Sequence, residues 1–145
     1  MKIFFFTTLI ALASCLVYFR PAPTQSIQAD RKYANPQFNY QIDWPETYTI
    51  DEARGELVVM NSTSGRLRIN AGCFDWGTEG MVSTSEQVTI ENLQGLKERF
   101  YLNSKLYMIR YAFTQNDRCY YLELFSSTEL GWQELLGLAK SFRIN

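Results

Sequence analysis

Large apolar residues alternate with polar ones where the chain first turns apolar after residue 37. In "FNYQIDWP" the apolar side chains Phe38, Tyr40, Ile42 and Trp44 occupy every second position. Such alternation has the period of a half-buried β-strand. Pro45 then ends the strand, because proline has no N–H to donate to a sheet.

The stretch "GELVVMNSTSGRLRINAGC" predicts two strands around a polar turn. Residues 57–60 form the first strand. The second strand alternates between an apolar and a polar face: Leu67, Ile69, Ala71 and Cys73 against Arg66, Arg68 and Asn70.

Further strand signals follow in "VTIENL", "GLKERFYLN", "KLYMIRYAFTQ" and "RCYYLELFSS". Turn residues separate them at 94–95, 103–104 and 116–117, so we predict a consecutive antiparallel meander. The last strand carries bulk on both faces and should be central and covered twice. A short helix is expected at residues 84–87.

The spacing of apolar residues changes from the strand period to the helical one in "STELGWQELLGLAKSFRIN". Leu130, Leu135, Leu138 and Phe142 recur near helical spacing, which predicts a C-terminal helix packed across the sheet. Thr128 is its expected N-cap. The expected class is therefore α+β: an antiparallel meander sheet flanked by a C-terminal helix.

The first 19 residues have the layout of a secretory signal, with Lys2 followed by an apolar run over residues 3–19. Within it, "LASC" resembles the lipobox of bacterial lipoproteins, in which the cysteine is lipidated and becomes the mature N-terminus. By that resemblance, Cys15 carries the lipid. Residues 20–37 hold three of the four prolines and few large apolar side chains, and we expect them to form an extended linker.

Two other interpretations of the leader stay open. The apolar run of 17 residues would be about 25 Å long as a helix, at the lower limit for crossing a bilayer. It is therefore also a candidate for an uncleaved anchor, especially since apolar "LVYF" follows Cys15. The third interpretation is an ordinary cleaved signal. All three predict an exported, membrane-associated or secreted domain at the extracytoplasmic face of the cell envelope.

Composition limits the chemistry. The chain of 145 residues has no histidine, which removes the commonest general base and the commonest zinc ligand. Its net charge of −1 argues against a nucleic-acid partner. We expect a single non-enzymatic domain over residues 38–145, with no cofactor and no metal.

The order of these elements resembles the PsbP-like family over residues 38–145. The matching features are an aromatic-rich strand ending in Trp44 and Pro45, a turn glycine at Gly95, and the pair Ser141 and Phe142 near the end. The founding member is an extrinsic subunit of photosystem II, and the fold, an antiparallel sheet flanked by helices, is shared with a Ran-binding protein of the Mog type. The resemblance implies an exported or membrane-peripheral protein that binds a protein partner, and it transfers no catalytic motif.

Two cysteines remain once Cys15 is assigned to the leader. Cys73 and Cys119 form a candidate disulfide in an oxidising compartment. The strand pattern places them on different faces, so buried free thiols and a reactive thiol stay as alternatives.

The loop around Phe74, Asp75 and Trp76 is the candidate partner contact, because exposed aromatic side chains in loops favour recognition. The alternative is that Phe74 and Trp76 cover the end of the core. Five carboxylates near the first strand could bind calcium, but their spacing favours a solvated acidic edge: Asp43, Glu46, Asp51, Glu52 and Glu56.

The resulting hypothesis is an exported, membrane-tethered binding or assembly-accessory domain that acts through a protein partner. A structural envelope lipoprotein and a carboxylate- or thiol-based enzyme are the alternatives.

Replacing Cys15 by alanine tests the leader. If Cys15 carries the lipid, Cys15→Ala abolishes both metabolic lipid labelling and membrane retention. A variant that stays unprocessed and membrane-bound would instead indicate an uncleaved anchor, and the intact mass of the mature N-terminus separates these cases.

Overall fold

The computed structural model describes residues 31–72, 74 and 77–145, which form ten strands and one helix. Seven strands make one antiparallel sheet. In spatial order they are β3 (Thr49–Arg54), β4 (Leu57–Asn61), β5 (Arg66–Asn70), β9 (Arg118–Phe125), β8 (Lys105–Gln115), β7 (Leu93–Leu102) and β6 (Val82–Ile90).

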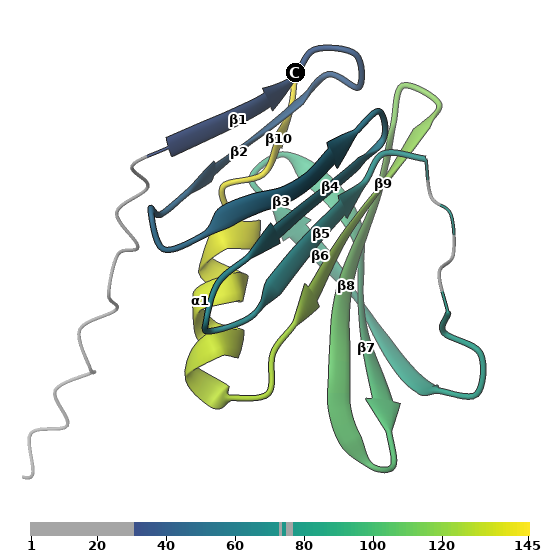
Figure 1. Ribbon diagram of the computed structural model, residues 1–145. Helices are drawn as coiled ribbons and strands as arrows, with labels where there is room; N and C mark the ends of the chain where they lie inside the picture. The colour runs from purple at the N-terminus through teal and green to yellow at the C-terminus, as the bar shows by residue number, and fades with distance from the viewer. Residues whose placement is uncertain (1–30, 73, 75–76) are drawn as a thin grey trace, which may run out of the picture.

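A smaller antiparallel sheet joins the two ends of the described domain. In it, β2 (Tyr40–Trp44) lies between β1 (Arg31–Asn35) and β10 (Arg143–Ile144). The helix α1 (Glu129–Ala139) lies against one face of the large sheet, and the β7–β8 hairpin extends beyond the other strands (Figure 1).

The expected α+β class is wrong, because the described chain is mostly β with a single 11-residue helix. The short helix expected at residues 84–87 lies inside β6, where every residue pairs with β7. Residues 31–35, expected as linker, form β1 instead. This segment pairs with β2, and Tyr33 packs 6.1 Å from both Tyr40 and Trp44 between ring centroids.

Several local predictions are confirmed. β2 is alternately buried, and β4 and β5 form a hairpin. The meander of β6 to β9 is consecutive and antiparallel, and β9 is the fourth of seven strands. The first meander turn differs from the prediction: Glu91 adopts a positive φ of 53°, whereas Gln94 and Gly95 belong to β7.

Phe142 lies at the centre of the aromatic core between the two sheets. It is fully buried, and its ring centroid is 5.5 Å from that of Tyr40 and 6.1 Å from those of Phe113 and Tyr120. Aromatic pairs at these separations add to the stability that burial provides. The same residue therefore packs against the small sheet and the large one.

The neighbouring Ser141 connects the segment after α1 to β2. Its hydroxyl donates to the carbonyl of Asp43 at 2.8 Å, and the Asp43 amide donates back to the hydroxyl at 3.1 Å. Both members of the pair noted in the sequence thus hold the C-terminal segment against the N-terminal strands.

The start of α1 fits closely against the β4–β5 turn. Thr128 is the N-cap, as predicted, and accepts a hydrogen bond from the Gly131 amide at 3.1 Å. A side chain at Gly131 would collide with the Ser64 carbonyl oxygen, so the close approach requires glycine.

Leu135 and Leu138 are buried as expected, but Leu130 is 69% exposed because it points away from the sheet. Within the described residues, no helix is long and apolar enough to cross a membrane.

Leu135 and Leu130 offer a matched test of this packing. Leu135→Ala should lower the free energy of unfolding by about 2–5 kcal/mol, because it leaves a cavity under α1. Leu130→Ala should change it by no more than about 0.5 kcal/mol. Urea denaturation followed by tryptophan fluorescence measures both, and equal losses would contradict this orientation of the helix.

Candidate functional site

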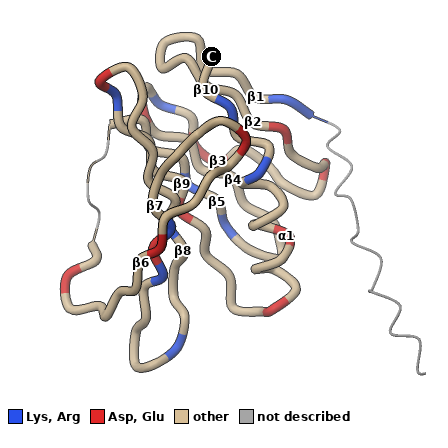
Figure 2. The backbone as a smooth tube through the Cα atoms, turned by 180° about the vertical axis from the view of Figure 1, so that it is seen from behind, with Lys and Arg blue, Asp and Glu red and all other residues tan. Residues whose placement is uncertain are grey.

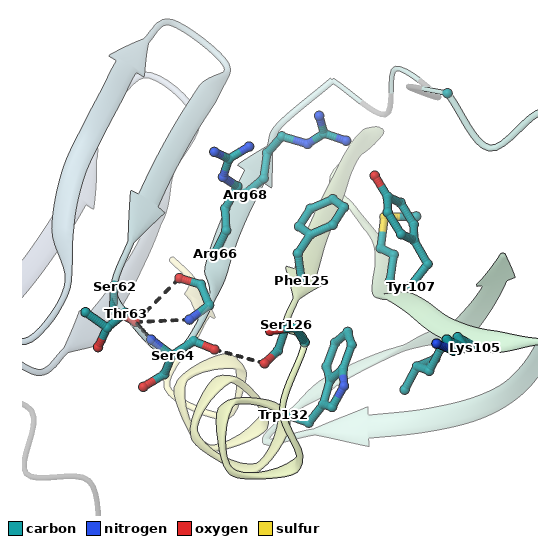
Figure 3. Close-up of a pocket in the computed structure, with 15 residues that line it drawn as sticks. Ser62, Thr63, Ser64, Arg66, Arg68, Lys105, Tyr107, Phe125, Ser126 and Trp132 are labelled. Atoms are coloured by element: carbon teal, nitrogen blue, oxygen red, sulfur yellow. Dashed lines mark hydrogen bonds between the residues drawn. The ribbon is translucent and has the colours of Figure 1, made fainter.

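An open groove of about 1030 Å³ lies at one end of the large sheet. We call it the basic groove. Its described lining comes from the turn at residues 62–65, from β5, from Gly77, from residues 105–108 of β8, from the end of β9 with residues 126–127, and from Trp132 of α1. Figure 3 shows Arg66 and Arg68 on one side, Lys105 on the other, and Phe125 and Trp132 between them.

Strand register brings these residues together. Arg66 pairs directly with Phe125 across β5 and β9, so their side chains share one face of the sheet. Lys105 begins β8, the next strand beyond β9. Tyr107 on β8 meets Phe125 edge to face at 5.8 Å between ring centroids.

A row of alternating charges crosses four strands beside the groove. Arg68, Glu123, Arg110 and Glu98 are successive cross-strand partners on β5, β9, β8 and β7. The Glu123 carboxylate is fully buried, with one oxygen bound to the Arg68 Nε and the other 2.9 Å from an Arg110 Nη. Glu98 approaches Arg110 at 3.8 Å. We call these four residues the charge ladder.

Aromatic rings cover the two arginines of the charge ladder. The Arg110 guanidinium lies 4.9 Å from the Phe100 ring centroid and 4.5 Å from that of Tyr121. The Arg68 guanidinium lies 5.5 Å from the Phe125 centroid. Since Glu123 neutralises Arg68, this arginine supports the groove more than it adds net charge to it.

Arg66 and Lys105 are the uncompensated cations of the basic groove. No carboxylate of the described residues lies within ion-pair distance of either side chain, and the Arg66 Nε donates only to the Asn61 side-chain oxygen at 2.8 Å. None of the described residues that line the groove is Asp or Glu. Elsewhere both signs are interspersed along the chain, so this is a local feature (Figure 2).

Tyr48 is a buried phenol close to Ser62 of the groove and to Glu134 of α1. One carboxylate oxygen of Glu134 is buried and has no hydrogen-bond partner among the described residues. Burial raises the pKa of Tyr48, a hydrogen bond with the Ser62 side chain lowers it, and the nearby Glu134 charge raises it. This phenol therefore stays neutral at physiological pH.

The arm formed by β6 and β7 has its own charge cluster outside the groove. Arg99 lies 2.9 Å from Glu86 and holds the pKa of that carboxyl below its usual value, with Lys97 adding to the effect.

Burial raises the pKa of Tyr111, on β8, to about 12. Because that value lies above the ordinary one, ionisation of Tyr111 in strong alkali destabilises the fold.

The structure describes only some of the site residues that the sequence predicts. Cys119 is disulfide-bonded. Both other cysteines, Cys15 and Cys73, lie outside the described residues, so the pairing of Cys73 with Cys119 stays a prediction. Phe74 is 56% exposed. Asp75 and Trp76 also lie outside the described residues, and their role as a partner contact stays a prediction.

The acidic residues near β2 and β3 are engaged in ordinary surface contacts. Glu46 lies 3.6 Å from Arg31, and Glu52 lies 3.5 Å from Arg54. Asp51 accepts a hydrogen bond from Asn61 at 3.1 Å. In the part of the chain that the structure describes, no group of carboxylates and cysteines could hold a metal ion.

Sequence reasoning did not identify the basic groove. The sequence predicts a polar face on β5 and a polar turn before it, but it does not predict that they border a groove. Lys105 and Trp132 come from distant parts of the chain, and only the pairing of β5 with β9 and of β9 with β8 brings them to Arg66.

Comparisons with known proteins concern the fold. No protein-family model and no curated protein matches the sequence. The solution structure of cyanobacterial PsbP (CyanoP) from Synechocystis sp. PCC 6803 is similar, with a TM-score of 0.56 and 13% identity over 79% of this chain and 92% of that one. The chain has a PsbP-like fold.

A second similar structure is a crystal structure from Bacteroides thetaiotaomicron VPI-5482. It has a TM-score of 0.55 and 12% identity, and the match covers 79% of this chain and 48% of that chain. The PsbP-like resemblance noted in the sequence is thus confirmed at the level of fold. At such low identities the likeness extends to the fold alone.

The charge ladder supplies a stability test for this PsbP-like domain. Glu123→Gln should lower the free energy of unfolding by about 3–5 kcal/mol, because it leaves two arginines without their shared counter-charge. Glu98→Gln, at the solvated end of the ladder, should cost about 1 kcal/mol or less. Urea denaturation compares them, and similar small losses would show that Glu123 is not required for the register of β5, β9 and β8.

Proposed function

We propose that this PsbP-like domain is exported, tethered to the membrane at its extracytoplasmic face, and acts as a non-enzymatic binding or assembly-accessory module for a protein partner. The PsbP-like fold supports a domain of this type. The basic groove supplies the surface for the partner.

The observation that carries the proposal is the lining of the groove. It combines cations and aromatic rings with hydroxyl side chains, and its described lining holds no carboxylate and no cysteine. Arginine and large aromatic residues contribute most to protein–protein binding energy. With no histidine in the chain, the serines of the groove have no neighbouring imidazole to activate them. The arrangement therefore suits noncovalent recognition.

The predicted lipobox in the leader supports the tether. If Cys15 carries a lipid, residues 16–30 connect it to β1. A fully extended chain of that length reaches about 50 Å. This reach would allow the domain to meet the extramembrane part of a membrane-bound partner while it stays anchored.

Site-specific photo-crosslinking tests the proposal in isolated membranes. A benzophenone amino acid at Tyr107, which is 45% exposed inside the groove, should give one defined protein adduct. The same amino acid at Ile50, which is 39% exposed on edge strand β3, is the matched control and should not give that adduct. Mass spectrometry identifies the product.

Absence of any adduct at Tyr107, or the same set of adducts at both positions, would contradict a partner-binding role for the groove. Recovery of the chain in the cytoplasmic fraction would contradict the tether.

A further inference from the structure

We infer that the basic groove binds an extended acidic segment of the partner, whose carboxylates meet Arg66 and Lys105 while an apolar or aromatic side chain covers Phe125. This inference rests on the proposed function and specifies the chemistry of the partner.

Charge complementarity is the first argument. The whole chain has a net charge of −1, yet the described groove lining holds three cations and no carboxylate. Glu123 compensates Arg68, whereas Arg66 and Lys105 have no carboxylate within ion-pair distance among the described residues. A cationic hollow on a nearly neutral protein favours an anionic ligand by attraction at close range.

The spacing of the cations indicates how the charges of that ligand are arranged. Arg66 lies on β5 and Lys105 on β8, with β9 between them, so their strands are two spacings apart. Arg66 lies opposite Phe125, which is one residue beyond the pair of Leu124 with Ile109, so Lys105 also lies about two to three residues farther along the strands. Two strand spacings of about 10 Å and an offset of about 7–10 Å along the strands separate the two positions by about 12–14 Å. Alternate residues of an extended peptide share a face and each residue rises about 3.3 Å, so carboxylates four residues apart, about 13 Å, can face both cations.

The groove lacks the features of a site for a single phosphate. Three of the four amides of the turn at residues 62–65 already donate within the domain: Ser62 to the Gly65 carbonyl, and Ser64 and Gly65 to the Ser62 hydroxyl. In this described turn, no cluster of free amides is therefore left to surround a phosphate in the way that anion-binding loops do. A volume of about 1030 Å³ also exceeds what one phosphate fills.

The floor between the cations is aromatic and partly exposed. Phe125 lies between Arg66, its cross-strand partner, and Tyr107, its edge-to-face neighbour, as Figure 3 shows. Tyr107 keeps 45% of its surface exposed. Such a floor accepts an apolar or aromatic side chain placed between the two carboxylates.

Fluorescence anisotropy tests the inference with the full chain in detergent micelles. The probe is a fluorescein-labelled peptide of repeated Glu-Ser-Tyr-Ser units, in which Glu and Tyr alternate on one face of the extended chain, and a second peptide carries Gln in place of Glu. The protein variant combines Arg66→Gln with Lys105→Gln. The matched control combines Lys32→Gln with Arg54→Gln, which removes the same charge from exposed positions on β1 and β3.

The wild-type and control proteins should bind the acidic peptide, and the groove variant should bind it about tenfold more weakly, since two exposed ion pairs are lost. Added salt should weaken wild-type binding. The Gln peptide should bind to the wild-type protein no more tightly than the acidic peptide binds to the groove variant.

Equal binding of the acidic peptide to the groove variant and the control would overturn the inference, and so would equal binding of the two peptides. Vesicles of phosphatidylcholine with phosphatidylglycerol provide a further comparison. If the groove variant loses vesicle binding while no protein binds the peptide, the groove is a site for anionic lipid instead.

The crosslinking result separates this inference from the proposed function. If the adduct at Tyr107 forms but the acidic peptide does not bind, the partner is recognised through other chemistry and only this inference is wrong. If both fail, the proposed function is wrong as well.

Discussion

The fully buried carboxylate of Glu123 constrains the centre of the large sheet. A carboxylate without solvent is costly unless cations and hydrogen bonds compensate it. Arg68 and Arg110 do so from the strands on either side, and this is possible only in the observed register of β5, β9 and β8. The distant strand β5 is thereby fixed against the β8–β9 hairpin in one alignment. The row that holds Arg66 against Phe125 follows from the same alignment.

The other face of the same strands is held by apolar contacts. There the aromatic cluster around Phe142 and the leucines of α1 cover the sheet, while Ser141 attaches the C-terminal segment to β2. β9 thus lies between an ionic layer and a hydrophobic one. The basic groove lies at the end of this twice-covered region, so its arginines and aromatic rings are presented from strands that are packed on both faces. Side chains that are held in place before binding lose little freedom on binding, which favours the partner recognition that we propose.

Local features of the sequence predicted much of the fold. The alternation in β2 and β5, the polar turn between β4 and β5, and the Asn-containing turns at residues 103–104 and 116–117 all act within a few residues. The predicted class was wrong because β1, β3 and β6 are edge strands. They are mostly polar and exposed, so their sequences lack strong alternation. Pairing with a neighbour makes them strands, and pairing is not visible in one segment.

The sequence by itself determined which segments are central strands, where the C-terminal helix begins, and that the 145 residues include no histidine. The tertiary structure decided that the domain is mostly β, that Leu130 faces outward, and that Arg66, Lys105 and Trp132 border one groove. The physical reason is how far apart in the chain the interacting residues lie. Periodicity and turn preference depend on neighbours in the chain, whereas the groove depends on the β5–β9–β8 register, which is set by contacts between residues more than fifty positions apart, such as Arg68 and Glu123.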